Sequence, residues 1–266
     1  MRYFKLALLI SLLSAAAYAV YRPAQGAFGG SWVGYTLGSL GALLIVLLLW
    51  FGVRKRRYRS SLGQVQGWLS AHVYLGTSLV VIVTLHTGFE VGLNVHTLAY
   101  VLMLMVIASG MIGAYAYTRY PSLITDNLRD DTLESLMLGM TDLDRQARAA
   151  ALGLSDDINA AVMRAAQHTR LGGSAWRQLA GRDRRCATTQ AVLVVERASS
   201  KLPLAQQAAG QLVYSLLLRK VELLRRARRD IALRAWQQLW LYLHVPLSIA
   251  LLAALIAHVV AVFAYW

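Results

Sequence analysis

The chain has 266 residues, of which 57% are hydrophobic and only 15% are charged, a composition more apolar than that of an ordinary soluble domain. Its formal net charge of +14 does not indicate nucleic-acid binding, because the basic residues cluster where apolar runs end, as in the cytoplasmic loops of membrane proteins. The single cysteine, Cys186, excludes an internal disulfide or iron–sulfur site, and the sequence contains no CxxCH haem-attachment motif and no GxGxxG or GxxxxGKS/T nucleotide motif.

Five apolar stretches are long enough to cross a membrane as helices. They cover residues 4–21, 33–53, 65–89, 97–117 and 236–265. The first is either a secretory signal, with AYA at 17–19 as its cleavage site, or a retained anchor, and we expect the anchor. The basic run RKRRYR at 54–59 follows the second stretch and marks the cytoplasmic side. We therefore expect the N-terminus inside, the C-terminus outside, and a location in the bacterial cytoplasmic (inner) membrane.

The polar residues 122–235 predict a helical insert between the fourth and fifth spans. The run DTLE at 131–134 has the form of a capping box, and Ser155 is expected as the next N-cap. Glycines at 172, 173 and 181 are expected to separate helices. The segment 204–229 favours a long helix, and its many Arg and Lys residues indicate a cytoplasmic insert. We interpret the insert as a docking platform for a redox partner.

The predicted fold is an all-α integral membrane bundle of five transmembrane helices, four of which form the core, with a cytoplasmic helical insert. The expected divisions are an anchor or signal span with an outer loop, core spans two to four, the insert, and the last core span. These cover residues 1–32, 33–121, 122–235 and 236–266.

Two stretches in the third and fifth spans begin and end with histidine: HVYLGTSLVVIVTLH at 72–86 and HVPLSIALLAALIAH at 244–258. Fourteen residues of helix rise about 21 Å in nearly four turns, so both imidazoles of a stretch project from roughly one face. Both spans are expected to run outward, which brings the first histidines of the two stretches level with each other, and the last histidines likewise. Each level then offers two neutral nitrogen ligands that can bind a six-coordinate haem iron from both sides.

An isolated intramembrane histidine can instead simply donate a hydrogen bond to a neighbouring helix. Ionisable residues are costly in a bilayer, however, and here four of them form two matched pairs. We therefore predict two non-covalent b-type haems. The predicted metal ligands are His72, His86, His244 and His258.

The arrangement resembles the transmembrane di-haem b cytochromes, in which two parallel helices each carry two histidines at this spacing. Respiratory cytochrome b and the ferric reductase/NADPH oxidase membrane domain both have it, and the helix direction is more similar to the latter. The resemblance covers residues 33–117 and 236–266. It implies an inner haem on the first histidines, an outer haem on the last, and electron flow between them.

The sequence also departs from the ferric reductase type. That type often continues into a sixth span and a flavin and nicotinamide domain, and its fourth and fifth spans are joined by a short connection rather than an insert. We therefore expect electrons to enter from a quinol or from a partner subunit that carries an iron–sulfur cluster, a flavin or a c-type haem. Besides these, membrane lipid is the expected partner.

Several smaller features are candidates for cofactor contacts. Gly76, Gly110 and Gly113 could give a macrocycle room. The span-two glycines, Gly34, Gly38 and Gly41, could do the same, but for them we favour ordinary helix packing. Arg54 and Arg119 could pair with inner haem propionates, or they are topology signals. His96 is a candidate for a quinone or an outer propionate contact, or is an interfacial histidine. Pro246 is expected to loosen its helical turn.

The predicted function is electron relay across the membrane between a quinone pool or redox partner and an acceptor, as a subunit of an oxidoreductase complex rather than as a stand-alone enzyme. One alternative is a quinol-oxidising or ferric reductase-type enzyme in its own right. The other is a non-haem transporter or scaffold. The lack of Asp and Glu beside the histidines in the spans argues against this last alternative.

Overall fold

The structure, a computed structural model, describes residues 2–21, 29–55, 65–183 and 185–264 and contains helices but no strands within these ranges. It divides into two compact units. The first consists of Met1–Tyr115 and Trp240–Trp266, and the second of Ala116–Leu239.

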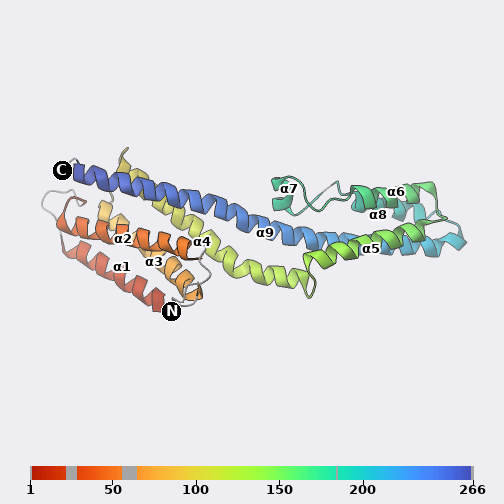
Figure 1. The fold of residues 1–266 in the computed structure, drawn as a ribbon, viewed down its shortest axis with the longest axis horizontal. Helices are drawn as coiled ribbons and strands as arrows, with labels where there is room; N and C mark the ends of the chain where they lie inside the picture. The colour runs from red at the N-terminus through yellow and green to blue at the C-terminus, as the bar shows by residue number, and fades with distance from the viewer. Residues whose placement is uncertain (1, 22–28, 56–64, 184, 265–266) are drawn as a thin grey trace. The chain divides into compact units, whose positions relative to one another are not determined.

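The first unit contains three complete helices and parts of two others (Figure 1). The complete ones are α1 (Arg2–Val20), α2 (Trp32–Lys55) and α3 (Val65–Thr87), and the others are α4 (Val95–Leu128) and α9 (Leu204–Ala264). Helices α1, α2 and α3 pack against one another. All five are long and apolar enough to cross a membrane, so the prediction of a helical membrane bundle is confirmed.

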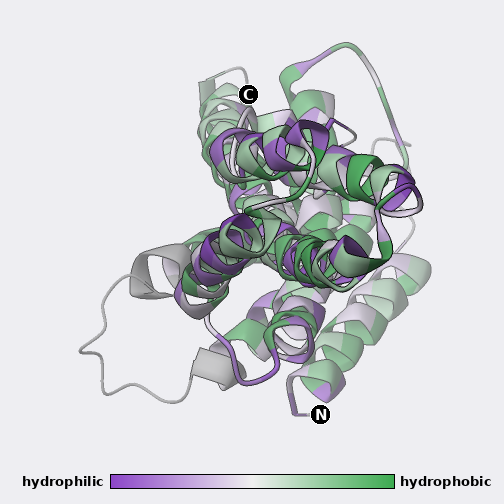
Figure 2. Cartoon of the chain, turned by 90° about the vertical axis from the view of Figure 1, so that its right-hand side faces the viewer, coloured by the Kyte–Doolittle hydropathy of each residue, from purple (hydrophilic) through white to green (hydrophobic). Residues whose placement is uncertain are grey.

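The surface of this unit carries the apolar side chains that a lipid-facing helix needs. On α1, Leu12 and Leu13 are about three-fifths exposed, and Figure 2 shows hydrophobic residues predominating along this helix. Several segments of the sequence lie outside the described part of the chain. These are residues 22–28 of the first loop, the basic residues 56–59, the side chain of Arg54, and the terminal Tyr265 and Trp266.

A buried apolar cluster forms the centre of the first unit. Helix α3 contributes Leu79 and Ile82, α4 contributes Met103, and α9 contributes Leu251. Leu79 and Ile82 lie between the two histidines of α3 in sequence, and Leu251 lies between the two histidines of α9. The cluster therefore forms an apolar layer between the two histidine levels.

Two helices continue beyond the boundaries expected from the sequence. Helix α4 does not end near Tyr117 but runs through Pro121 to Leu128, and α9 is one helix of 61 residues that includes Pro246. The long helix expected over 204–229 and the fifth span are therefore one element. The change from polar to apolar residues suggested two elements. Helix propensity does not follow polarity, however, because Arg, Lys, Gln and Glu favour a helix about as well as Leu does, and the segment 211–245 contains neither glycine nor proline.

The second unit contains α5 (Leu133–Ala151), α6 (Asp156–His168), α7 (Ala175–Ala180) and α8 (Ala187–Ser199), together with the end of α4 and the first part of α9. Ser155 is the N-cap of α6, as predicted. The capping box of α5 is shifted by one residue from the prediction: Thr132 is the N-cap, and its partner is Ser135 rather than Glu134. A serine hydroxyl also reaches the N-cap backbone N–H, so it replaces the carboxylate here.

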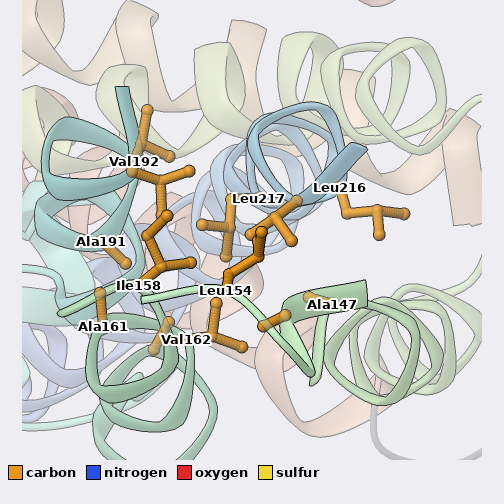
Figure 3. Close-up of a cluster of buried hydrophobic side chains, with 13 residues drawn as sticks. Ala147, Leu154, Ile158, Ala161, Val162, Ala191, Val192, Leu216 and Leu217 are labelled. Carbon is orange, nitrogen blue, oxygen red and sulfur yellow. The ribbon is translucent and has the colours of Figure 1, made fainter. Parts of the chain in front are cut away.

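The core of the second unit joins α5, α6, α8 and α9 (Figure 3). Ile158 and Val162 of α6 meet Val192 of α8 and Leu217 of α9 in this cluster. Small residues such as Ala161 and Ala191 line the contact between α6 and α8. They let the two helices approach closely, which favours dense packing and a rigid helical unit.

A buried ion pair ties α9 to two neighbouring helices in this core. The Nζ atom of Lys220, which is 4% exposed, donates to both carboxylate oxygens of Asp144 at 2.6 and 2.7 Å. It also donates to the Ala165 carbonyl at 2.9 Å. Without its carboxylate partner, the ammonium group would be a buried charge with one backbone acceptor.

We expect Asp144→Ala to destabilise the second unit by about 3–5 kcal/mol, because breaking a buried pair leaves an uncompensated charge. Hydrogen–deuterium exchange of the full chain in detergent should show faster exchange in peptides from α5 and α6. The matched control is Asp142→Ala on the same helix. Its partner Arg145 is 81% exposed, and the expected loss is below about 1 kcal/mol. Equal protection in the two variants would contradict the prediction.

Candidate functional site

Three histidines from three helices meet at one end of the first unit, and we call them the His86 cluster. His86 lies in the last turn of α3, His96 at the start of α4, and His258 near the end of α9. The ring centroids of His86 and His258 are 6.1 Å apart and their planes are perpendicular, at 88°. His96 and His258 are closer, with centroids 4.5 Å apart and the two Nδ1 atoms at 2.5 Å.

The tautomer of His86 follows from its hydrogen bond. Its Nδ1 lies 2.7 Å from the carbonyl oxygen of Gly34 on α2. A carbonyl can only accept, so Nδ1 carries the proton and the neutral ring has its lone pair on Nε2. A backbone carbonyl on Nδ1 is the usual second partner of a histidine that binds a metal through Nε2.

Gly38 on α2 makes room for the same ring. A Cβ atom at this position would lie 2.7 Å from Cε1 and 2.9 Å from Nδ1 of His86, closer than non-bonded atoms approach. We interpreted Gly34 and Gly38 from the sequence as ordinary packing residues. In the structure both contact the ring of His86: Gly34 through its carbonyl oxygen, and Gly38 because it has no side chain. A Cβ at Gly41 would instead meet Val83, so the packing interpretation holds for this glycine.

The other two histidines of the spans, His72 and His244, form the His72 pair. Both side chains are partly buried, His72 on α3 and His244 on α9. Beside His72 there is a small apolar hollow. It is lined by Leu47, Leu48, Trp68, Ala71, His72 and Leu75.

Ser109 of α4 orients His244. Its hydroxyl donates to the Val106 carbonyl at 2.8 Å and lies 2.8 Å from Nδ1 of His244. Because its single proton goes to Val106, the oxygen accepts from Nδ1–H of His244, and the lone pair of this ring is again on Nε2. Trp240 stacks on the ring with centroids 5.2 Å apart and donates from Nε1 to the Ser109 carbonyl at 2.7 Å.

The glycines of α4 allow this contact. A Cβ at Gly110 would touch Cε1 of His244 at 3.5 Å, and one at Gly113 would overlap the indole of Trp240. Gly76 on α3 has more space, because its Cβ would only touch Leu48 at 3.8 Å. Trp240 is thus a direct contact of His244.

The remaining candidates are not brought to the histidines by any described contact. Arg119 is exposed and belongs to the second unit, and the side chain of Arg54 lies outside the described residues. His168 is exposed at the end of α6 and belongs to the second unit. Trp240 and Ser109 were not predicted from the sequence as partners of His244. Trp240 lies one helical turn before His244, and Ser109 lies one turn before Gly113.

Cys186 is buried at the N-terminus of α8, with Nη2 of Arg228 at 3.3 Å from its sulfur. Burial raises the pKa of the thiol, but hydrogen bonds from the backbone of Thr189 and from Arg228 outweigh this effect and lower the pKa overall. Cys186 is 1% exposed, so we interpret it as part of the core and not as a reactive thiol.

The His86 cluster has the dimensions of a two-imidazole metal site. A metal held between two imidazole nitrogens, each at about 2 Å, places the ring centroids about 6 Å apart, and His86 and His258 are 6.1 Å apart. Within the described residues no group of three or more His, Cys, Asp or Glu is arranged to enclose a bare ion. A metal ion at this position would therefore take its remaining ligands from outside the described residues.

No protein-family model, curated protein or solved structure matches the sequence. The functional interpretation therefore depends on the geometry of the two histidine sites.

Proposed function

We propose that this membrane protein is a di-haem b-type cytochrome that relays electrons across the membrane. His86 and His258 would hold the outer haem and His72 and His244 the inner one. The observation that carries the proposal is the geometry of the His86–His258 pair, with centroids 6.1 Å apart and the His86 tautomer fixed by Gly34.

The chain's own residues hold the ligands in one orientation. Gly34 and Ser109 accept from Nδ1–H of His86 and His244, which leaves Nε2 available on both rings and restricts ring rotation. When bound, haem supplies one-electron redox chemistry at a potential set by its ligands and their surroundings. The apolar layer around Ile82 and Leu251 excludes water between the two levels, which are about 21 Å apart along a helix.

The second unit is the proposed docking platform for a redox partner. In the topology expected from the basic run at 54–59, this unit lies in the cytoplasm, and the His86 cluster lies toward the outer face of a bacterial cytoplasmic membrane. Electrons would come from a quinol, or from a docked subunit with an iron–sulfur cluster, a flavin or a c-type haem. The chain is then a subunit of an oxidoreductase complex.

The test is a dithionite-reduced minus oxidised absorption spectrum of the purified full chain, with pyridine haemochrome quantitation. We expect two b-type haems per chain and no covalently attached haem after acid–acetone extraction. A colourless protein from haem-replete cells would overturn the proposal and would favour a structural or transport role for the histidines.

A further inference from the structure

His96 occupies a fixed position at the start of α4. The side chain of Asn94 accepts from the backbone N–H of Thr97 at 2.9 Å, and the hydroxyl of Thr97 accepts from the N–H of Gly92 at 3.0 Å. These bonds cap the first turn of the helix. His96 is therefore presented to His258 by a capped turn and not by an irregular loop.

The contact between the two rings determines which nitrogen of His258 is available. The two Nδ1 atoms are 2.5 Å apart, so one of them donates a proton and the other accepts it. If the neutral His258 ring carries its lone pair on Nε2, its Nδ1 is the donor and Nδ1 of His96 is the acceptor. His96 then acts on His258 as the Gly34 carbonyl acts on His86 and Ser109 acts on His244.

We propose that His96 is a positioning residue of the outer site, which accepts a hydrogen bond from Nδ1 of His258 and so directs Nε2 of that ring toward the iron. This inference rests on the proposed haem function for its redox consequence, but the His96–His258 bond itself does not require haem. Donation from Nδ1 makes the ligand more basic and stabilises the oxidised metal. Loss of the acceptor is therefore expected to make the outer haem potential more positive.

The test compares two substitutions at the same position. In His96→Asn, the side-chain oxygen stands the same number of bonds from the backbone as Nδ1 of histidine, so the acceptor is retained. His96→Leu fills a similar volume without an acceptor. The local control is Leu98→Ala, because Leu98 lies in the same turn and is 53% exposed.

Three readouts are measured on the full chain in detergent: the midpoint potential of each haem, the low-spin ferric EPR signal, and the 15N shifts of selectively labelled histidines. We expect His96→Leu to shift the outer potential in the positive direction, to change one of two EPR signals, and to move the 15N resonance of His258 Nδ1 toward that of an N–H group without a hydrogen-bond acceptor. His96→Asn should restore all three toward the unsubstituted protein, and Leu98→Ala should change none.

Unchanged readouts in His96→Leu, or an Asn variant that behaves like the Leu variant, would overturn the inference. The 15N measurement separates this failure from failure of the proposed function. A protein without haem would overturn the cytochrome proposal, while its histidine tautomers would still decide whether His96 accepts from His258.

Discussion

Replacing His86 by alanine is expected to reduce the haem content from two to one per chain. The substitution removes one of two imidazoles whose centroids are 6.1 Å apart and leaves His258 as a single axial ligand. His72 lies about 21 Å from His86 along α3. Its proposed co-ligand, His244, is held by separate contacts with Ser109 and Trp240. The remaining haem should therefore keep its potential and its absorption band, as measured by redox titration and by pyridine haemochrome quantitation.

Two further variants make this expectation specific. His258→Ala should give the same one-haem species as His86→Ala, whereas His72→Ala should retain the other haem and give the complementary spectrum. His168→Ala is the control, since it removes an exposed histidine of the second unit and should leave both haems. If His86→Ala retains two haems of unchanged potential, the ligand assignment is wrong.

Gly38→Ala is expected to weaken the outer site almost as much as removal of a ligand. The added Cβ would lie 2.7 Å from Cε1 of His86, so the ring must move away from α2 and from the Gly34 carbonyl. Loss of such an orienting partner typically weakens metal binding by about 10- to 100-fold. Glycine to alanine favours the helix itself by about 1 kcal/mol, so a loss of haem could not be attributed to a weaker helix.

Gly76→Ala is the matched control for this substitution, because its Cβ would make only an ordinary contact with Leu48 at 3.8 Å. Haem titration into the apo-protein measures the affinity of both sites in each variant. We expect Gly76→Ala to bind two haems with unchanged affinity and Gly38→Ala to lose affinity at one site. Equal titration curves for the two variants would contradict the prediction, because they would show that haem affinity does not depend on the position of His86 against α2.

The sequence predicts the helical spans, and the face of each helix on which the histidines lie, because both depend on local pattern. An apolar run of about 20 residues has few alternatives to a membrane helix, and a separation of fourteen residues determines that His72 and His86 share a face of α3. The N-cap at Ser155 could likewise be predicted from the neighbouring residues alone. These features needed no knowledge of how one helix is rotated against another.

The partners of the histidines depend on tertiary packing and could not be predicted in this way. The role of Gly38 depends on which face of α2 packs against His86. In the structure this is the face of Gly38, and the ring of His86 occupies the space that a side chain there would need. Similarly, His96 is only ten residues from His86 in sequence, but its hydrogen-bond partner is His258. The continuity of α9 from the segment 204–229 into the fifth span was missed because a change of polarity was taken as a change of element.

Helix α9 supplies half of each histidine pair, and this has a consequence for the order of events during synthesis. His96 and His258 are separated by 162 residues, which a ribosome adds in roughly 8–30 s at about 5–20 residues per second. During that interval α3 and the start of α4 are already made, while neither pair has its second imidazole. The two histidine pairs can be completed only after the second unit has been translated, so the proposed haems would bind at the last stage of assembly.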